Sequence, residues 1–520
     1  MKDNSVSIRN ALSKQVWRQT SLAAGSAAIA MILAACSTGA SSSATSTSDS
    51  ANSLPTTVVS PAVATNAQSE VPVISSRNGR VRVDLTAAES QVPYDGTQRW
   101  AMTYNGGATG PTIRVHPGDK MTITLVNNLN QPTSLHTHGL HVAPVQDNPF
   151  SMVDPGQTIT YNYDIPKDQQ AGTYWYHPHV HTRTAEQVAS GLSGAIIVED
   201  NTDTALAKVS TDHVLVINDP PLSTTNPWNG GNGSSTGMGS MMGGSTGMNM
   251  GSGSMMGGSS GMNMMAAMTG RTGPRLLTNG TDGVTFAPSS GKLERTHVVN
   301  ATASTQLRLT FDGKQMLQLA SPGGRLAAAR HVTSIDLAPG QRTEVVLIPG
   351  PSGGVLSAQR LSNEGNAQPV GATERIAGVS ATAGMDASKL PVAMTANTRD
   401  LFAPSVQVDA VRTITLDGHM NPTIDGKLFD PNTINFTAKK GTVEEWIIKS
   451  NSPMVHPIHL HSWPFQVQGE QGWNDVVSVP AYGQKVIRVA FDDFGGTTVL
   501  HCHILDHEDT GMMAIIKVTD

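Results

Sequence analysis

Short runs in which apolar and polar residues alternate recur along most of the chain after about residue 80. Examples are TIRV at 112–115, TITY at 158–161 and VIRV at 486–489. A period of two residues is typical of β-strands that bury one face. Frequent glycine and proline and few charged residues accompany these runs, and about 450 residues of such chain are enough for about three domains. The pattern predicts antiparallel β-sandwiches with little helix.

The N-terminal region has a different pattern. Basic residues within the first 18 positions precede an apolar run over about 22–35, which is too short for a comfortable membrane span and fits a secretory signal. The sequence LAAC at 33–36 resembles a bacterial lipobox, in which Cys36 would become the lipid-modified first residue; the alternative is a chance cysteine after an ordinary signal. A stretch rich in Ser, Thr and Ala follows to about residue 68 and reads as a flexible tether. We therefore expect an extracytoplasmic protein, anchored to a membrane of the cell envelope through Cys36, on its periplasmic or outer face.

A second unusual segment spans about residues 228–269 and consists almost wholly of Gly, Ser, Met and Asn. GSMMGGSTGMNM at 239–250 is repeated nearly unchanged as GSMMGGSSGMNM at 253–264. With no charge and little to bury, the segment is expected to form a mobile loop. Thioethers select Cu(I), so the repeated methionines indicate a segment that binds Cu(I). The alternative is a low-complexity spacer that expanded by repeat slippage. The candidate ligands for substrate copper here are Met241, Met242, Met248, Met250, Met255, Met256, Met262, Met264 and Met265.

The last twenty residues contain the second of the two cysteines in the chain. His501-Cys502-His503 is followed by His507 and Met512. A thiolate, two imidazoles and a weak axial thioether form a blue-copper electron-transfer site, provided that a second imidazole comes from elsewhere, for which His456 is the candidate. With Cys36 assigned to the anchor and Cys502 to copper, no intrachain disulfide is expected.

Four His-x-His pairs stand in the chain, at 136/138, 177/179, 459/461 and 501/503. Side chains at i and i+2 of a strand point to the same face, and the residue between them points to the other. If residues 499–504 form a strand, His501 and His503 face one way and Cys502 the other. A cysteine-bound copper would then be connected through the backbone to metals bound by the histidines. One such pair alone would be an ordinary surface or core feature, but four pairs with the cysteine favour a multinuclear copper site.

These four motifs, in this order and at these internal spacings, resemble those of the multicopper oxidases, the family of laccases, bilirubin oxidases and bacterial cuprous oxidases. HCHILDHEDTGMM at 501–513 and WYHPHVHTRTAEQVASGLSGAIIVED at 175–200 are especially similar to the bacterial copper-efflux oxidases. The resemblance covers roughly residues 80–520. It implies an all-β fold of three cupredoxin-like Greek-key β-sandwich domains. After a signal at 1–35 and a tether at 36–70, we place these domains at 71–203, 204–395 (with the methionine-rich loop) and 396–520.

The resemblance also implies a ligand set for four copper ions. The type 1 copper would take His456, Cys502, His507 and axial Met512; the type 2 copper His136 and His459; and the type 3 pair His138, His177 and His503 on one ion and His179, His461 and His501 on the other. Asp147 and Glu508 match the acidic residues of the family's proton relay, and Met454 and Asp509 resemble residues that hold substrate copper. Two positions depart from the pattern: Thr137 stands where many relatives have tryptophan, and Ser452 stands where an acidic residue is expected.

The function implied by the resemblance is one-electron oxidation of a donor coupled to reduction of dioxygen to water, with Cu(I) as the leading donor and copper detoxification as the purpose. The alternatives are a laccase-like oxidase of small phenols and, from another class, a copper-sequestering lipoprotein that stores metal in the methionine loop. A copper nitrite reductase is disfavoured because it needs no coupled copper pair. The net charge of −6 gives no reason to expect a nucleic-acid partner, and we expect a monomer. His141 and His181, which lie beside the motifs, are expected to have structural roles.

Overall fold

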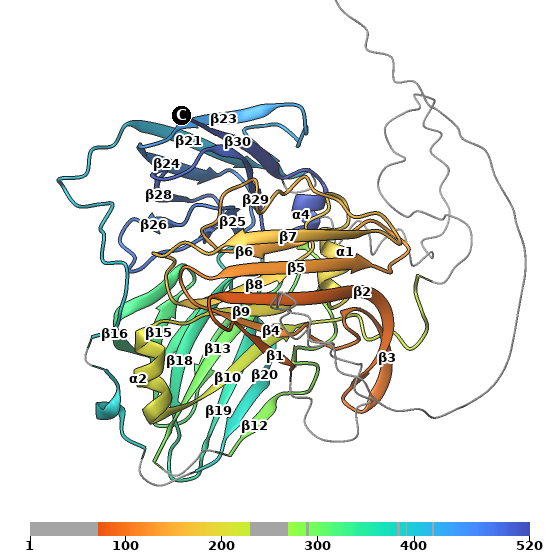
Figure 1. Ribbon diagram of the computed structural model, residues 1–520, viewed down its shortest axis with the longest axis vertical. Coiled ribbons are helices and arrows are strands. Elements are labelled where there is room, and N and C mark those ends of the chain that lie inside the picture. Colours follow the sequence, from red (N-terminus) through yellow and green to blue (C-terminus); the bar gives the residue numbers. More distant parts are fainter. Residues whose placement is uncertain (1–70, 229–268, 288–290, 382–384, 392, 419–420) are drawn as a thin grey trace, which may run out of the picture. The chain divides into compact units, whose positions relative to one another are not determined.

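The computed structural model describes residues 71–228, 269–287, 291–381, 385–391, 393–418 and 421–520, all within the unit Thr56–Asp520. The predicted signal, the tether with Cys36, and the nine candidate methionines between Met241 and Met265 lie outside the described residues. The strands of Figure 1 fall into three groups along the chain, coloured orange to yellow, green, and blue. We call the three groups the first, middle and third domains.

The first domain contains two sheets that enclose a shared core. Their strand orders are β1-β4-β9-β8-β6 and β3-β2-β5-β7. The strands are β1 (Val73–Ser75), β2 (Arg80–Tyr94), β3 (Thr97–Tyr104), β4 (Thr112–Val115), β5 (Lys120–Asn127), β6 (His136–His138), β7 (Thr158–Asp164), β8 (Gly172–His177) and β9 (Gly194–Val198). Alternate residues of β2 and β5, such as Val83, Leu85 and Ile123, are buried in this core, as the period of two predicts. Helix α1 (Thr184–Ala189) precedes β9.

The middle domain follows helix α2 (Asn201–Val209), whose N-terminus is closed by a capping box between Asp200 and Asp203. Its sheets have the orders β11-β10-β13-β18-β15-β16 and β12-β20-β19-β14-β17. The strands are β10 (Ser210–Asn218), β11 (Leu277–Thr278), β12 (Val284–Phe286), β13 (Leu293–Asn300), β14 (Gln306–Phe311), β15 (Gln315–Ser321), β16 (Gly324–Val332), β17 (Ser334–Leu337), β18 (Arg342–Ile348), β19 (Gly354–Leu361) and β20 (Pro369–Val379), and a short 3-10 helix (Ala387–Lys389) follows them.

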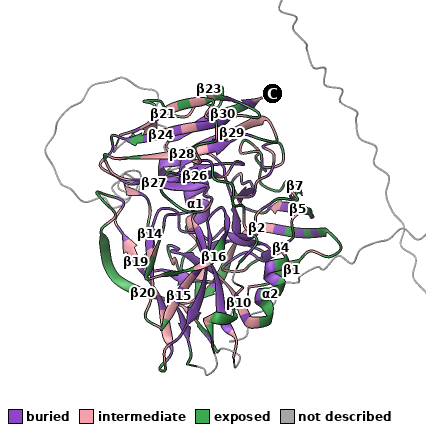
Figure 2. Cartoon of the chain, turned by 90° about the vertical axis from the view of Figure 1, so that its left-hand side faces the viewer, coloured by how far each residue is buried: buried purple, intermediate pink, exposed green. Residues whose placement is uncertain are grey.

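The third domain repeats the two-sheet arrangement, with the orders β22-β21-β24-β28-β26 and β23-β30-β29-β25-β27. The strands are β21 (Ala410–Asp417), β22 (Thr423–Ile424), β23 (Ile434–Lys439), β24 (Val443–Ser450), β25 (His456–Leu460), β26 (Phe465–Val467), β27 (Val476–Val479), β28 (Gln484–Ala490), β29 (Gly496–Cys502) and β30 (Met513–Thr519). Helix α4 (Leu505–Asp509) lies between β29 and β30. Cys502, Met512 and Met454 are buried in the core that these sheets enclose. The strands of Figure 2 carry buried residues interspersed with exposed ones, as expected for sheets with one solvated face.

The predicted all-β class and the three cupredoxin-like domains are confirmed, and the alternating runs at 112–115, 158–161 and 486–489 all lie in strands. Two details were wrong. The sheets are mixed, because pairs such as β2 with β5 and β10 with β13 are parallel and are joined by crossovers longer than a hairpin turn. The strand predicted at 499–504 ends at Cys502, since α4 begins three residues later. Among the described residues, no helix is long and apolar enough to cross a membrane.

Candidate copper centres

The four His-x-His pairs lie at the ends of paired strands of the first and third domains. In the first domain, β6 and β8 are antiparallel and place His136 opposite His177. In the third domain, β25 and β29 are antiparallel and place His459 opposite His501. The second histidine of two of the pairs, His461 and His503, follows directly after a strand. The registers therefore gather imidazoles from distant parts of the sequence at two strand ends.

The eight histidines of these pairs form three groups, two of which share His138, and within each group the ligand atoms lie within 4.8 Å of one another. Across the two domains, His136 Nε2 lies 3.3 Å from His459 Nε2. Within them, His138 Nδ1 lies 3.3 Å from His177 Nε2, and His461 Nε2 lies 3.1 Å from His501 Nε2. All eight side chains are buried. The groups are His136, His138 and His459; His138, His177 and His503; and His179, His461 and His501.

Burial lowers the pKa of seven of these imidazoles and so favours the neutral form that binds metals. It lowers the pKa of His177 to about 3 and that of His179 to about 4, and the neighbouring histidines contribute to both shifts. Several rings have one nitrogen held by a backbone carbonyl: His177 Nδ1 by Pro178 at 2.8 Å and His459 Nδ1 by Asp475 at 2.8 Å. A carbonyl accepts only from a protonated nitrogen, so the other nitrogen of each ring keeps its lone pair for a ligand.

Buried nitrogens without a hydrogen-bond partner also fit a cation-binding site. Within the part of the chain that the structure describes, both ring nitrogens of His179 and His503, and Nε2 of His138, have no hydrogen-bond partner. A buried polar atom left unpaired is costly, so such atoms are expected to bind a water molecule or an ion. An ion that binds neutral imidazole removes this cost. The donor set, borderline nitrogen throughout, therefore fits copper.

A further group joins His456, Cys502 and His507, all fully buried. The sulfur of Cys502 lies 3.5 Å from His456 Nδ1 and 3.7 Å from His507 Nδ1. Met512 is buried in the same core, and its carbonyl accepts a hydrogen bond from the Cys502 N–H at 3.1 Å. Burial raises the pKa of the Cys502 thiol, so a thiolate here needs a cation beside it. Thiolate with two imidazoles fits a copper ion that uses a soft ligand.

The structure places the two predicted acids against the histidine groups. Asp147 lies 2.7 Å from His136 Nδ1 and accepts hydrogen bonds from the N–H and hydroxyl of Thr137 at 2.9 and 3.2 Å. Burial raises the pKa of Asp147 to about 7. Thr137, which stands where many relatives have tryptophan, thus stabilises the carboxylate of Asp147 through two hydrogen bonds.

Glu508 is fully buried and accepts a hydrogen bond from the Thr184 hydroxyl at 2.8 Å. Its oxygens lie 3.1 Å from His501 Nδ1 and 3.5 Å from His179 Nε2. Burial alone would raise the pKa of Glu508, but these two histidines lower it. Asp147 and Glu508 therefore have opposite pKa shifts and contact different histidines.

The structure gives the two predicted substrate residues other partners. Met454 is fully buried, and its N–H donates to the Ser452 hydroxyl at 3.2 Å. The carboxylate of Asp509 accepts hydrogen bonds from the N–H groups of Thr184 and Ala185 at 3.1 and 2.9 Å, and so caps the first turn of α1. The geometry of these two residues is that of core packing and helix capping.

Sequence reasoning missed the contribution of the middle domain. The guanidinium of Arg342 is fully buried and pairs with both oxygens of Asp475, at 2.7 and 2.6 Å. Asp475 in turn lies 3.7 Å from His138 Nε2. A Cβ on Gly340, whose φ is +82°, would lie 2.7 Å from His503 Nε2. The segment 337–342 therefore forms a wall of the histidine groups.

The two extra histidines beside the motifs have structural contacts. His141 bridges the first and third domains: Nδ1 lies 2.7 Å from the Ser462 carbonyl and Nε2 lies 2.8 Å from the Asp493 carboxylate. His181 packs against the ring of Phe429. These contacts agree with the expected structural roles.

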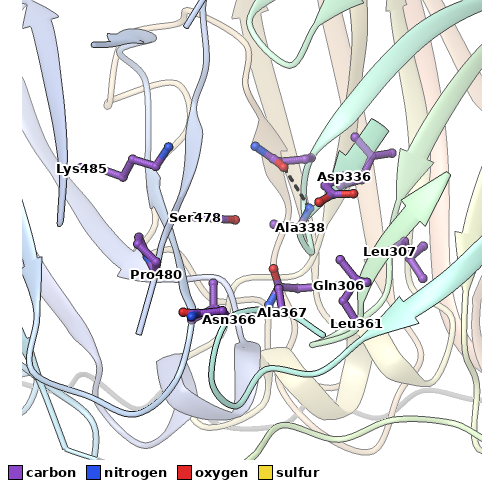
Figure 3. A pocket seen from close by; sticks show the side chains of 13 residues that line it. Gln306, Leu307, Asp336, Ala338, Leu361, Asn366, Ala367, Ser478, Pro480 and Lys485 are labelled. Carbon is purple, nitrogen blue, oxygen red and sulfur yellow. Dashed lines mark hydrogen bonds between the residues drawn. The ribbon is translucent and has the colours of Figure 1, made fainter. Parts of the chain in front are cut away.

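A cleft of about 360 Å³ lies between the middle and third domains. Figure 3 shows Lys485, Ser478 and Pro480 on one side and Gln306 and Asp336 on the other. Its lining includes the residue before His456, Val455. The cleft therefore reaches the neighbourhood of the cysteine-containing group.

Comparisons with known proteins agree with this geometry. Three family profiles described as multicopper oxidase match residues 86–203, 232–351 and 403–520. Multicopper oxidase mco of Staphylococcus aureus is 31% identical over 462 residues, covering 85% of this chain and 89% of that protein. Cell division protein FtsP of Escherichia coli K12 is 27% identical over 447 residues, covering 81% and 85%.

Solved structures show the same fold. A multicopper oxidase from Campylobacter jejuni, described as a metallo-oxidase, superposes with a TM-score of 0.69 at 26% identity, covering 86% of this chain and 94% of that one. A laccase from Pediococcus acidilactici superposes with a TM-score of 0.67 at 23% identity, covering 87% and 93%. From the matched profiles and the extent of these relatives, the chain belongs to the multicopper oxidase family.

Proposed function

We propose that this protein is a copper-dependent oxidase that couples one-electron oxidation of a donor to the four-electron reduction of dioxygen to water. The observation that carries the proposal is the convergence of eight histidines in three groups, next to a fourth group that contains the thiol of Cys502. In this assignment, His456, Cys502 and His507, with Met512, would hold the type 1 copper. His136 and His459 would hold the type 2 copper. The type 3 pair would take His138, His177 and His503, and His179, His461 and His501.

Bound copper would supply the redox chemistry, because it cycles between Cu(I) and Cu(II). The chain would supply the path between the groups: Cys502 is directly bonded through the backbone to His501 and His503, so one peptide bond on either side links it to a residue whose imidazole belongs to the cluster. Burial of all these side chains excludes bulk water from the path. Cys502 is thus the residue through which electrons would leave the type 1 site.

Reduction of dioxygen also needs protons, and we assign their supply to Asp147 and Glu508. With its pKa raised to about 7 by burial, Asp147 can hold and release a proton near neutral pH beside His136. Glu508, between His179 and His501, would orient these ligands and relay protons towards the cluster. Substitution of either acid by its amide is expected to slow dioxygen reduction more than donor oxidation.

For the donor, we favour Cu(I), in a detoxifying role at the cell envelope with Cys36 as the lipid anchor and the chain as a monomer. The support is compositional: eleven of the 23 methionines fall between residues 228 and 269. Thioethers bind Cu(I) in preference to harder ions. Met454 and Asp509 add little support for a Cu(I) substrate, because the Met454 side chain is buried in the core and the Asp509 carboxylate caps helix α1.

Two specific observations favour other functions. The cleft beside Val455 could admit a small phenol near His456, which would make the protein a laccase-like oxidase. The likeness to cell division protein FtsP raises a role in cell division, and the methionine-rich segment raises storage of Cu(I). The complete set of buried ligands argues against both roles, because neither needs it.

The test is dioxygen uptake by the copper-loaded, full-length protein with Cu(I) or a simple phenol as the only donor. Deletion of residues 229–268 and the Cys502→Ser substitution are compared with the parent. Fast Cu(I) turnover that collapses on deletion while phenol turnover persists supports a cuprous oxidase. Cu(I) turnover that is absent while phenol is oxidised supports the laccase reading. If neither donor is oxidised by the four-copper protein, the proposal of an oxidase is wrong.

A further inference from the structure

Helix α4 carries His507 and Glu508 and is held by all three domains. From the middle domain, the carbonyl of Ala303 accepts a hydrogen bond from the Leu505 N–H at 2.9 Å. From the first domain, Thr184 and Ala185 donate their N–H groups to Asp509. A five-residue helix has too few internal hydrogen bonds to be stable alone, so its direction depends on these outside contacts.

The strongest outside contact on α4 comes from Arg271. Its backbone N–H donates to Asp506 Oδ2 at 2.7 Å, and its Nε donates to Oδ1 at 2.9 Å. Its Nη2 also lies 2.8 Å from Oδ1. Asp506 is buried and directly precedes His507 in the sequence. Charge-assisted bonds of this kind are about twice as strong as neutral ones, and here three donors converge on one carboxylate.

Arg271 is itself fixed by its surroundings. The hydroxyl of Ser304 donates to the Arg271 carbonyl, and the Asn363 side-chain amide donates to the Thr269 carbonyl at 2.9 Å. Gly270 has φ +82°, and a Cβ there would lie 2.8 Å from the Ile504 side chain, just before α4. Such a close approach in the left-handed region requires glycine. The segment 269–271 is therefore held in place by these contacts and packs against Ile504, which directly precedes helix α4 and the proposed type 1 ligand His507.

The other flank of residues 229–268 ends in the same region. The indole N–H of Trp228 donates to Glu186 of helix α1 at 3.0 Å, and Asn130 donates to the Trp228 carbonyl at 3.3 Å. Helix α1 is the helix that Asp509 of α4 caps. Both described flanks of the methionine-rich stretch thus end on the α1–α4 pair.

We propose that Arg271 is a positioning residue for the type 1 copper: by holding Asp506, it fixes helix α4 and with it the imidazole of His507. The proposal rests on the proposed function for the identity of the type 1 ligands. Arg271 is not one of the proposed ligands; it acts through Asp506. Partners behind metal ligands typically change metal affinity or activity by about 10-fold to 100-fold when they are removed.

The test uses Arg271→Ala, Arg271→Lys and Asp506→Asn in the full-length protein. Arg412→Ala is the matched control, since Arg412 makes a similar two-point contact with the carboxylate of Glu444 in the third domain. Two readouts are independent of turnover: hydrogen exchange of the peptide 504–512 in the metal-free protein, and the electron paramagnetic resonance signal of the type 1 copper in the loaded protein. Cu(I) and phenol turnover are measured alongside.

We expect Arg271→Ala and Asp506→Asn to exchange about tenfold faster over 504–512 and to bind type 1 copper about 10-fold to 100-fold more weakly, with an altered hyperfine splitting. Arg271→Lys should recover part of this effect because it keeps the charge but not the fork of donors. The control should match the parent. If Arg271→Ala fails to fold, Asp506→Asn carries the test, because it preserves the shape of the side chain.

The outcomes separate this inference from the proposed function. Unchanged exchange and an unchanged type 1 signal in Arg271→Ala and Asp506→Asn would overturn the positioning role even if Cu(I) is oxidised rapidly. A changed signal and faster exchange uphold that role even if Cu(I) proves to be no substrate, and only the choice of donor then fails.

Discussion

The buried pair of Arg342 and Asp475 gives the prediction that follows most directly from the geometry. Every N–H of the guanidinium has a partner: Nε donates to the Thr173 carbonyl at 3.0 Å, and the two terminal nitrogens donate to Asp475 and to the carbonyls of Gly340 and Pro322. These partners come from all three domains. Replacing Arg342 by Met keeps much of the side-chain volume but leaves a buried carboxylate without its cation.

The expected cost is that of breaking a buried ion pair, about 3–5 kcal/mol. Arg342 is 0% exposed and Asp475 is 2% exposed, so solvent screening does not reduce it. At an unfolding entropy of about 2.1 cal/mol/K per residue, a cooperative unit of about 450 residues would melt about 3–5 °C lower. Because Asp475 lies 3.7 Å from His138 Nε2, the variant should also hold less type 3 copper.

The assay is scanning calorimetry of the metal-free protein, with copper content measured separately after loading. Arg308→Met is the matched control, since Arg308 makes a two-point contact with Asp336 at 38% and 52% exposure. An exposed pair contributes about 0–1 kcal/mol, so the control should melt close to the parent. Adding Asp475→Leu to Arg342→Met should restore part of the loss, because it removes the unpaired charge. An Arg342→Met variant that melts with the parent, or a double variant less stable than the single one, would refute the reasoning.

Three further predictions follow from other contacts. Burial alone would lower the pKa of His141, but its hydrogen bond to Asp493 raises it, so this contact stabilises the fold fully below pH ~6.5 and stops doing so as pH rises through the raised pKa. The melting temperatures of the parent and of His141→Gln should therefore converge towards alkaline pH. A difference that grows with pH would contradict this. Gly340→Ala should lower the free energy of unfolding by at least about 1 kcal/mol and reduce the copper content, because its Cβ would meet His503. Gly365→Ala, at φ +65° with nothing within 4 Å, should show only the effect of backbone strain. Equal copper content in the two variants would contradict a close contact between Gly340 and the histidines. Removal of copper should lower the melting temperature and loosen the contact between the first and third domains, and identical melting of the two forms would argue against ligands shared across that contact.

The sequence was most informative where function depends on local spacing. The i, i+2 rule placed His501 and His503 on one side and Cys502 on the other, and the structure has this arrangement even though β29 ends at Cys502. Alternation of apolar residues likewise predicted strands. These features follow from the geometry of a few consecutive residues, which a sequence displays directly.

Contacts between residues far apart in the chain could not be predicted from the sequence. The pairing of Arg342 with Asp475 and that of Arg271 with Asp506 join residues 133 and 235 positions apart. Nothing in the local pattern of either arginine distinguishes it from a surface residue. The parallel pairing of β2 with β5 was missed for the same reason, since strand order depends on how distant segments cross. The lipid anchor at Cys36 and the methionine-rich ligands stay predictions, because they lie outside the described residues.

The most direct test of the central claim is the copper content and spectrum of the full-length protein beside its Cys502→Ser variant. We predict four tightly bound copper ions and an intense blue band for the parent. The variant should hold three ions, lack the blue band and consume no dioxygen with either donor. A parent that binds many weakly held, colourless Cu(I) ions, or a variant that keeps the blue band and turnover, would contradict the account.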